Sequence, residues 1–323
     1  MADPVALDTW AGTDVVLSKV IDTLIDLRHT SARTFTRTMV MTLVVVATND
    51  DDAYRATQAM HALGTHHPAR MIVLQPQADV PQDGVDARVT LFGTAYTEHP
   101  IAFEEVVLVV RGAACAALDS IIEPFTMSDL PLVLWYPGSL PPMSDCLLPT
   151  ADTVLVDLRE APPDPALVEL ARRRGAVDLS WARLAPWREL LAGLFDHPRF
   201  RPFVTGVTSI EVEGKPGARR LLAGWLASRL QPQEPTIRLV DAQHAGIRMR
   251  ATHDGERASF AVVRDGDERA VRGTASIDGG PVHREVLPLP DDSLVWSLAQ
   301  ALTHLRRDSV WQEALEHAVL QAP

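Results

Sequence analysis

The chain has 323 residues, of which 46% are hydrophobic and 22% are charged, and its formal net charge is −12 at pH 7. These values are typical of a globular protein that is long enough for two separate cores. Nothing in the composition suggests nucleic-acid binding, which requires a basic face, and no apolar run reaches the roughly 20 residues that span a bilayer. The N-terminal segment MADPVALDTW lacks the basic start and apolar core of a signal peptide, so we expect a cytoplasmic protein with no nucleic-acid or membrane partner.

Charge is distributed unevenly along the chain. Residues 1–150 carry 8 basic and 18 acidic side chains, a net charge of −10, whereas residues 151–323 carry 22 basic and 24 acidic ones, a net charge of −2. This difference predicts two units with different surfaces.

The first half of the chain is predicted to alternate helices with buried strands. Apolar residues recur at helical spacing over 17–27 after a capping Thr13 or Asp14, and further helices are expected at 49–64 and 113–125. Six apolar, largely β-branched runs predict strands at residues 38–47, 69–76, 85–93, 104–112, 131–137 and 153–158. Such an alternation is typical of an α/β layer structure with a mostly parallel sheet.

The second half changes character after EAPPDP at 160–165, a proline-rich segment that is expected to be a connector. Short alternating runs separated by Asp-Gly and Gly-Gly signals predict antiparallel hairpins between about 236 and 290. Helices are expected at 167–175, from Pro186 through Leu194, at 217–230, and as one or two segments of 292–320. We therefore expect an α/β domain at 1–160 and an α+β domain at 161–323 with an antiparallel meander and C-terminal helices.

Catalytic, cofactor and metal motifs are absent from the sequence. Where a dinucleotide fold would carry GxGxxG, the segment VVVATNDDDA has no glycine, and its aspartates at 50–52 are expected to cap a helix. No P-loop or GxSxG elbow is present. His61 and the pair at 66–67 lack the partners of a metal site, and the two adjacent histidines are expected to be solvated at a helix end. Glu104 and Glu105 are expected to face opposite sides of a strand, which does not make a catalytic pair.

Two cysteines are candidate redox residues. Cys115 lies in the predicted helix at 113–125 and Cys146 in the polar loop PPMSDCLLPT, without the CxxC spacing of a zinc site. The alternative interpretation is that both are small core residues. Cys146 is expected to be the more reactive thiol, because a loop residue is more exposed and ionises more readily. A disulfide would require the two Cα atoms to lie within roughly 7 Å of each other.

Tryptophan, tyrosine and arginine gather in two stretches that carry no catalytic motif. In LPLVLWYPG, Trp135 and Tyr136 end a predicted strand, so one of them is expected to pack beneath a helix and the other to lie outward at the carboxyl edge. Tryptophan and arginine are enriched at interface hot spots, and core packing is the alternative, favoured for Trp187. The candidate partner-binding residues are therefore Trp135, Tyr136, Trp181, Arg183, Trp187 and Arg188.

The central segments carry a recognisable pattern. LPLVLWYPG, DLSWARLAPWRELLAGLFD and GARRLLAGWLASRL, with RTFTRTMVMTLVVVA and HHPARMIVL in the first half, resemble the bacterial glucose-6-phosphate dehydrogenase assembly protein family, OpcA. The resemblance covers most of residues 13–320. This chain departs from the family at Tyr136 and Pro137, where a second tryptophan or an arginine is frequent. The departure weakens the case for assigning a partner contact to these two positions.

The resemblance implies a non-enzymatic partner of glucose-6-phosphate dehydrogenase. Such a partner would favour the active oligomer or raise its activity, in support of the oxidative pentose phosphate pathway, and some members are linked to redox control through cysteines. The alternative class is an enzyme or sensor that binds a sugar phosphate or nucleotide at the carboxyl ends of the N-terminal sheet. Arg111 is the plausible phosphate ligand at that edge.

Overall fold

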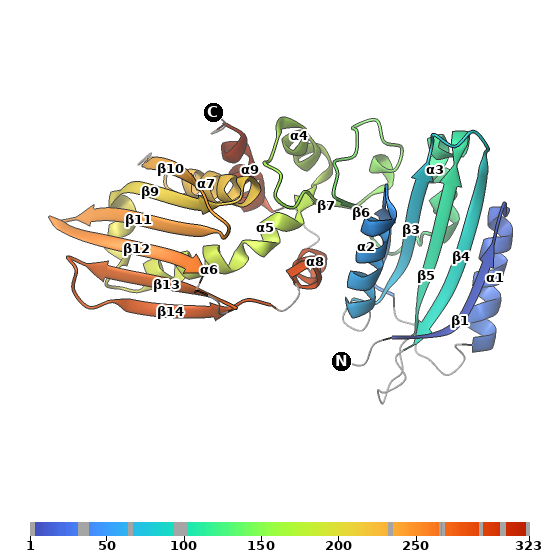
Figure 1. The fold of residues 1–323 in the computed structure, drawn as a ribbon, viewed down its shortest axis with the longest axis horizontal. Coiled ribbons are helices and arrows are strands. Elements are labelled where there is room, and N and C mark those ends of the chain that lie inside the picture. The colour runs from blue at the N-terminus through green and yellow to red at the C-terminus, as the bar shows by residue number, and fades with distance from the viewer. Residues whose placement is uncertain are drawn as a thin grey trace. The chain divides into compact units, whose positions relative to one another are not determined.

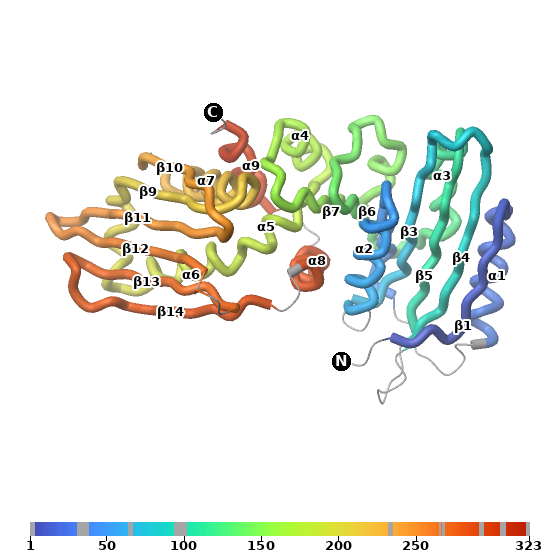
Figure 2. Tube along the Cα trace, in the orientation of Figure 1, coloured from blue at the N-terminus to red at the C-terminus, as the bar shows by residue number. Residues whose placement is uncertain are grey.

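The computed structural model describes residues 4–320 except 32–38, 64–66, 94–101, 232–234, 265, 267–268, 291–292 and 304–307. The chain divides into two compact units, and Figure 2 follows it through both. Unit 1 is built mainly from Met1–Asp157 and unit 2 mainly from Val177–Gln300, while short segments near 158–176 and 301–323 are divided between them. Each unit has its own sheet and is described by itself.

Unit 1 contains strands in the order β1-β4-β5-β3-β2-β6-β7 (Figure 1). The strands from β5 to β7 in this order are parallel, and β4 and β1 add antiparallel pairs at one edge. The expected α/β architecture with a mostly parallel sheet is therefore confirmed. The strands are β1 (Val5–Gly12), β2 (Met41–Val46), β3 (Ala69–Gln77), β4 (Gly84–Gly93), β5 (Ala102–Arg111), β6 (Leu132–Pro137) and β7 (Thr153–Asp157).

The edge strand β1 is not predicted by the sequence pattern. Its pairing with β4 shifts register between Ala6 and Asp8, and all of its side chains are exposed or half-buried. An edge strand of this kind lacks the continuous apolar run that identifies β2.

The central strands of unit 1 are buried on both faces. Every residue of β2 and of β6 is buried, and consecutive side chains of a strand point to opposite faces of a sheet. Both faces are therefore covered, which explains the continuous apolar runs of the sequence. The helices of this unit are α1 (Leu17–Ser31), α2 (Asp50–Leu63) and α3 (Leu118–Ile122).

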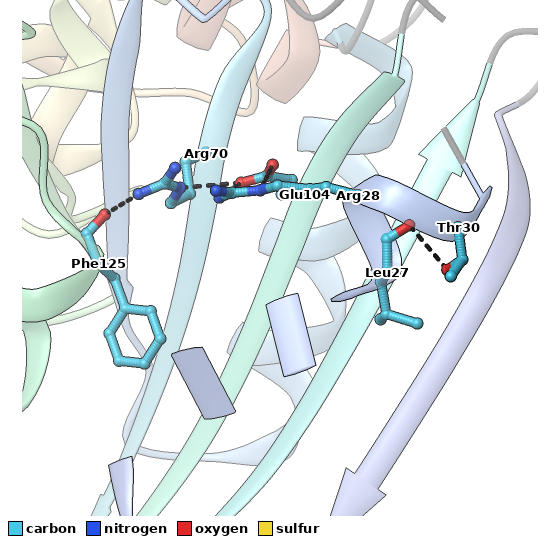
Figure 3. Close-up of polar contacts among 6 residues, drawn as sticks. All are labelled: Leu27, Arg28, Thr30, Arg70, Glu104 and Phe125. Carbon is cyan, nitrogen blue, oxygen red and sulfur yellow. Dashed lines mark hydrogen bonds and ion pairs between the residues drawn. The ribbon is translucent and has the colours of Figure 1, made fainter. Parts of the chain in front are cut away.

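Two adjacent glutamates on β5 bind helices that lie on opposite faces of the sheet. Glu104 accepts hydrogen bonds from Arg28 of α1, at 2.5 and 2.6 Å, and from Arg70 of β3, at 2.9 Å (Figure 3). Glu105 contacts His61 of α2 at 2.9 Å. Both glutamates are buried, so their charges are compensated inside the fold. The prediction that they face opposite sides is confirmed.

His61 is half-buried and packs on two aromatic rings. Its ring centroid lies 4.3 Å from that of Phe92 and 5.9 Å from that of Phe103, because this face of α2 packs on the sheet. His67 is half-buried, and His66 lies outside the described residues.

Asn49, rather than the aspartates at 50–52, caps α2. Its side-chain oxygen accepts a hydrogen bond from the amide of Asp52 at 2.8 Å, and its amide group donates to the Asp52 carboxylate at 2.8 Å. The three aspartates form the first turn, where negative charge is favourable to the helix dipole. The expected cap is therefore wrong by one residue, although the helix is confirmed.

The single helix predicted at 113–125 is replaced by three short segments. The 3₁₀ turns η1 (Gly112–Ala117) and η2 (Glu123–Phe125) flank α3. Pro124 lies in η2 and has no amide hydrogen, so a regular helix cannot continue through it. Two further 3₁₀ turns are η3 (Leu148–Thr150) and η4 (Arg201–Gly206).

Unit 2 contains a sheet with the strand order β10-β9-β11-β12-β13-β14. β10 is parallel to β9, and the other neighbours are antiparallel. The turns at Asp254-Gly255 and Asp278-Gly279 have positive φ at both positions, as type I′ turns require, so the predicted meander is confirmed for β11 to β14. The expectation that residues 236–241 belong to an antiparallel hairpin is wrong, because β10 pairs in parallel with β9. The strands are β9 (Val207–Gly214), β10 (Thr236–Asp241), β11 (Gly246–His253), β12 (Glu256–Arg264), β13 (Ala270–Ile277) and β14 (His283–Pro288).

Two helices of unit 2 pack on its sheet, and a third packs on one of them. α6 (Ala185–Asp196) lies against β12, β13 and β14, and α7 (Pro216–Arg229) lies against β9 and β10. α9 (Ser309–Leu320) packs on α7 at Gly224, where an added Cβ would lie 2.2 Å from the carbonyl oxygen of Ala314. The remaining elements are α4 (Pro165–Arg174), β8 (Val177–Asp178), α5 (Leu179–Arg183) and α8 (Ser293–Thr303).

Candidate partner-binding site

Trp181 joins two helices of unit 2. It lies in α5, whose first turn is fixed by Asp178, because the Asp178 carboxylate accepts a hydrogen bond from the Ser180 amide at 2.8 Å. The Trp181 indole N–H donates to Asp308 at 3.2 Å, and its ring centroid lies 5.6 Å from that of Trp311 in α9. Trp181 is buried, so its contacts hold α5 against the start of α9.

Arg188 of α6 stacks on the same tryptophan. Its guanidinium carbon lies 3.4 Å from the centroid of the Trp181 ring, and its Nη2 donates to the Trp181 carbonyl at 3.1 Å. Burial lowers the pKa of Arg188 to about 10, while the charges of Asp308 and Glu189 act in the opposite direction. The group therefore stays charged at neutral pH, and the cation–π contact fixes the turn between α5 and α6.

Arg183 and Trp187, which belong to the same sequence motif, face a different environment. They line an open pocket with a volume of about 350 Å³ in unit 2. We call it the arginine–tryptophan pocket, and its walls are Arg183, Trp187, Arg264, Arg269, Leu289, Pro290 and Trp296.

The walls of this pocket combine fixed aromatic surface with guanidinium groups. The indole N–H of Trp187 donates to the Ala245 carbonyl at 2.9 Å, which holds the ring in place. Arg264 contacts His244 through Nη1 at 3.2 Å, and its buried Nε has no hydrogen-bond partner within the described part of the chain. Guanidinium groups beside tryptophan rings suit a carboxylate or phosphate that is attached to a flat or apolar group.

Sequence reasoning identified only part of this pocket. The motif residues Arg183 and Trp187 were among the candidates, but Arg264, Arg269 and Trp296 were not. These three come from the meander and from α8, far along the chain, and only the folding of β12 and β14 beside α6 brings them to the motif. No local spacing signal points to them.

Trp135 and Tyr136 are both core residues, with 0% and 3% of their surfaces exposed. The expectation that one of them faces outward at the sheet edge is therefore wrong, because both faces of β6 are covered. The Tyr136 hydroxyl donates to Asp145 at 3.1 Å, and burial, reinforced by the Asp145 charge, raises the pKa of Tyr136. The Trp135 indole nitrogen has no hydrogen-bond partner within the described residues. Pro137 ends β6, as expected.

The two cysteines are free thiols, and both are half-buried. The Cys115 thiol donates to the carbonyl oxygen of Val110 at 3.1 Å. Cys146 lies close enough to Tyr136 to act on its titration. The greater reactivity of Cys146 stays a prediction.

Arg111, the phosphate ligand of the alternative function, is held by two carboxylates. It pairs with Asp86 at 2.7 Å and with Asp14. Its charge is therefore compensated within unit 1. In the described residues no group of three or more histidine, cysteine, aspartate or glutamate side chains is arranged to hold a metal ion. None of the described helices is long and apolar enough to cross a membrane.

Comparison with protein-family models gives two matches along the chain. Residues 60–173 match the model described as the glucose-6-phosphate dehydrogenase subunit N-terminal domain, and residues 174–315 match the corresponding C-terminal domain. The second match contains the motif at 181–188 and every wall of the arginine–tryptophan pocket.

Curated relatives carry the name OxPP cycle protein OpcA. The protein of Synechocystis sp. is 31% identical over 185 residues, which is 52% of this chain and 38% of the relative. That of Nostoc punctiforme is 28% identical, covering 53% and 40%, and that of Synechococcus elongatus is 24% identical, covering 59% and 45%. The matched part thus spans less than half the length of each relative.

Proposed function

Because the chain belongs to the OpcA family of glucose-6-phosphate dehydrogenase assembly proteins, we propose that it binds this dehydrogenase and favours its active oligomer without catalysing a reaction itself. The observation that carries the proposal is the match of residues 60–315 to two models that describe parts of a dehydrogenase subunit. The names of the curated relatives add a link to the OxPP cycle. This role would support the oxidative pentose phosphate pathway in the cytoplasm.

Activation of this kind requires differential binding. An activator shifts an enzyme between two states only if it binds the active state more tightly than the inactive one. A shift from 1:99 to 99:1 needs a difference of about 5 kcal/mol. A standard interface with a few tryptophan and arginine anchors provides a difference of that size.

The arginine–tryptophan pocket is the proposed anchor point for the dehydrogenase. It contains two of the candidate contacts, Arg183 and Trp187, and three residues that are distant in sequence. Trp181 and Arg188 are not walls of the pocket, but they fix the turn between α5, which carries Arg183, and α6, which carries Trp187. Trp135 and Tyr136, 0% and 3% exposed, are left out of the proposed contact, whereas Trp187, 8% exposed, is kept because it forms a wall of the pocket.

Enzyme kinetics with purified components test the proposal. We expect the chain alone to give no reduction of NADP with glucose 6-phosphate. Added to dehydrogenase from the same organism, it should raise activity and increase the fraction of the larger oligomer in sedimentation. Turnover by the chain alone, free of contaminating enzyme, would contradict the non-catalytic role. Unchanged kinetics and sedimentation at saturating concentrations would contradict the partnership.

A further inference from the structure

The two faces of the unit 2 sheet differ in what covers them. On one face, Leu190 and Leu194 of α6 lie against Gly273 of β13. Side chains alternate along a strand, so Arg272 and Thr274 point away from α6. The same alternation holds along β11, where buried residues alternate with exposed arginines. The face opposite α6 and α7 is therefore a polar surface, which we call the open sheet face.

The open sheet face has a charge opposite to that of the whole chain. The strand register places six arginines and two glutamates on it, a net charge of +4, whereas the chain carries −12. These residues come from all six strands of the sheet: Arg238, Arg248, Arg250, Arg257, Arg272, Arg284, Glu211 and Glu213.

The shape of this face permits close approach by another surface. It is hollowed, with a volume of about 580 Å³. The strand positions between the arginines carry small side chains, namely Ser209, Ser259, Ala261, Thr274 and Ser276, all of which line the hollow. Exposed apolar surface lies at one end, where Val282 and Val286 are each 53% exposed. A basic rim around a floor of small side chains suits a protruding element of another protein.

The positive charge of the face is only partly compensated. Arg238 and Arg248 lie 3.4 and 3.8 Å from Glu211, and Arg248 also pairs with Glu213. Arg250 and Arg284 are exposed, and among the described residues neither forms an ion pair. Uncompensated charges gathered on one surface attract molecules of opposite charge and speed their association.

We propose that the open sheet face docks an acidic surface of the dehydrogenase. This inference rests on the proposed function and adds the surface and the chemistry of the partner's contact. The open face is separate from the arginine–tryptophan pocket. Arg264, a wall of that pocket, and Phe260 lie four residues apart on β12, so their side chains point to the same face of the sheet. This is the face that α6 covers, because the centroid of the Phe260 ring lies 4.4 Å from that of Phe195 of α6. Substitutions on the open face therefore leave the pocket walls unchanged.

Charge reversal on the face tests this inference. The variant combines Arg238→Glu, Arg250→Glu and Arg284→Glu, none of which is a buried residue. The matched control combines Arg55→Glu, Arg173→Glu and Arg201→Glu, three exposed arginines outside the face, and changes the net charge by the same amount. The Kd and association rate for the dehydrogenase are measured with the full chain at low and high salt. Thermal unfolding of each protein confirms that it is folded.

We expect the open-face variant to raise the Kd at low salt by about tenfold or more, mainly through slower association, and to weaken its salt dependence. The control should change the Kd by less than about threefold. Equal effects of the two triple variants would overturn the assignment of the face. A salt-sensitive dimer of the chain alone, lost in the open-face variant, would assign the face to a second copy instead. Absence of binding by the wild-type chain would refute the proposed function itself. That result is distinguishable from equal effects of the two triple variants and from dimer formation.

Discussion

The two sheets of the molecule differ in the number of faces that are covered. In unit 1 the central strands β2 and β6 are buried at every residue. In unit 2 the strand β11 alternates buried residues with exposed arginines. An aromatic residue at the end of a strand in unit 1 therefore belongs to the core, whereas every second residue of a unit 2 strand such as β11 faces the surface.

This difference changes the meaning of the same sequence signal. Trp135 with Tyr136 in unit 1 and Trp187 with Arg183 in unit 2 look alike in sequence, since each combines a large aromatic residue with a hydrogen-bonding neighbour. Only the second pair lines a pocket that is open to solvent. The residue types identify candidate anchors for a partner protein. Whether one or both faces of the sheet are covered then decides which of these residues a partner can contact.

The largest expected effect is a loss of stability in unit 1. Trp135→Ala removes a fully buried indole from β6, so we expect the free energy of unfolding to fall by about 3–5 kcal/mol. Affinity of the folded variant for the dehydrogenase should not change. Urea unfolding and a binding titration below the unfolding transition give the two numbers. A Trp135→Ala variant with wild-type stability and lost affinity would instead show that Trp135 contacts the dehydrogenase.

A second test concerns the buried ion pairs of unit 1. Glu104→Gln leaves Arg28 and Arg70 beside a neutral group, so we expect a loss of about 3 kcal/mol in unfolding free energy. The matched control is Glu316→Gln, which breaks an exposed pair with Arg172 in unit 2 and should cost about 0.5 kcal/mol or less. Similar losses of unfolding free energy in both variants would show that burial does not increase the contribution of the Glu104 ion pairs to stability.

In unit 2 the corresponding change should affect binding. The double variant Arg269→Ala, Trp296→Ala removes two walls of the arginine–tryptophan pocket. We expect a loss of about 2 kcal/mol in affinity for the dehydrogenase, which is about thirtyfold in Kd. Titration calorimetry measures the affinity, and Arg172→Ala on α4 is the control. An unchanged Kd in a folded double variant would remove the pocket from the interface.

The smallest expected effect is a pH dependence of the stability of unit 1 that arises from Tyr136. Burial raises the pKa of this hydroxyl in the folded state above its ordinary value of 10. The unfolded chain therefore loses the proton first, and the contribution of Tyr136 to stability is complete below pH 10 and declines as the pH rises above it.

A comparison of Tyr136→Phe with the wild type isolates this contribution from other titrating groups. The stability difference between the two proteins should shift by about 1 kcal/mol per pH unit above pH 10 in favour of the variant. Unfolding curves at several pH values up to about 11 measure it. A difference that is constant with pH would indicate that the hydroxyl is more solvated than its burial suggests.

Much of the fold follows from local sequence signals. Asp254-Gly255 and Asp278-Gly279 predict hairpin turns, and both have the positive φ values of such turns. The apolar run over β2 predicts a strand covered on both faces, which the structure confirms. These signals succeed because the responsible residues are neighbours in sequence. The domain boundary expected at residue 160 stays a prediction.

The failures have non-local causes. β1 pairs with a strand that is distant in sequence, and a register shift between Ala6 and Asp8 disrupts its alternation. The burial of Trp135 depends on the covering of both faces of β6 by other parts of the chain. His61 is half-buried because Phe92 and Phe103 pack against it from strands that are distant in sequence. The pocket joins a local motif to residues of the meander and of α8, and this association exists only in the folded chain.

The close approach of α7 and α9 at Gly224 has a consequence for the order in which the protein folds during synthesis. The strands β1 to β7 of unit 1 all lie before residue 158, so they can pair while the rest of the chain is still being translated. Unit 2 differs, because Gly224 and Trp181 both pack against α9, whose residues are Ser309–Leu320.

The packing surface of α7 therefore stays exposed until the ribosome has made almost all of the 323 residues. Exposed apolar surface on a nascent chain is a substrate for chaperones and a source of aggregation. A chain that is released before α9 is complete would present a folded first unit attached to an unfinished second one. The motif around Trp181 would then lack its packing against α9. Chaperones or proteases would bind such an incomplete chain before a partner protein could.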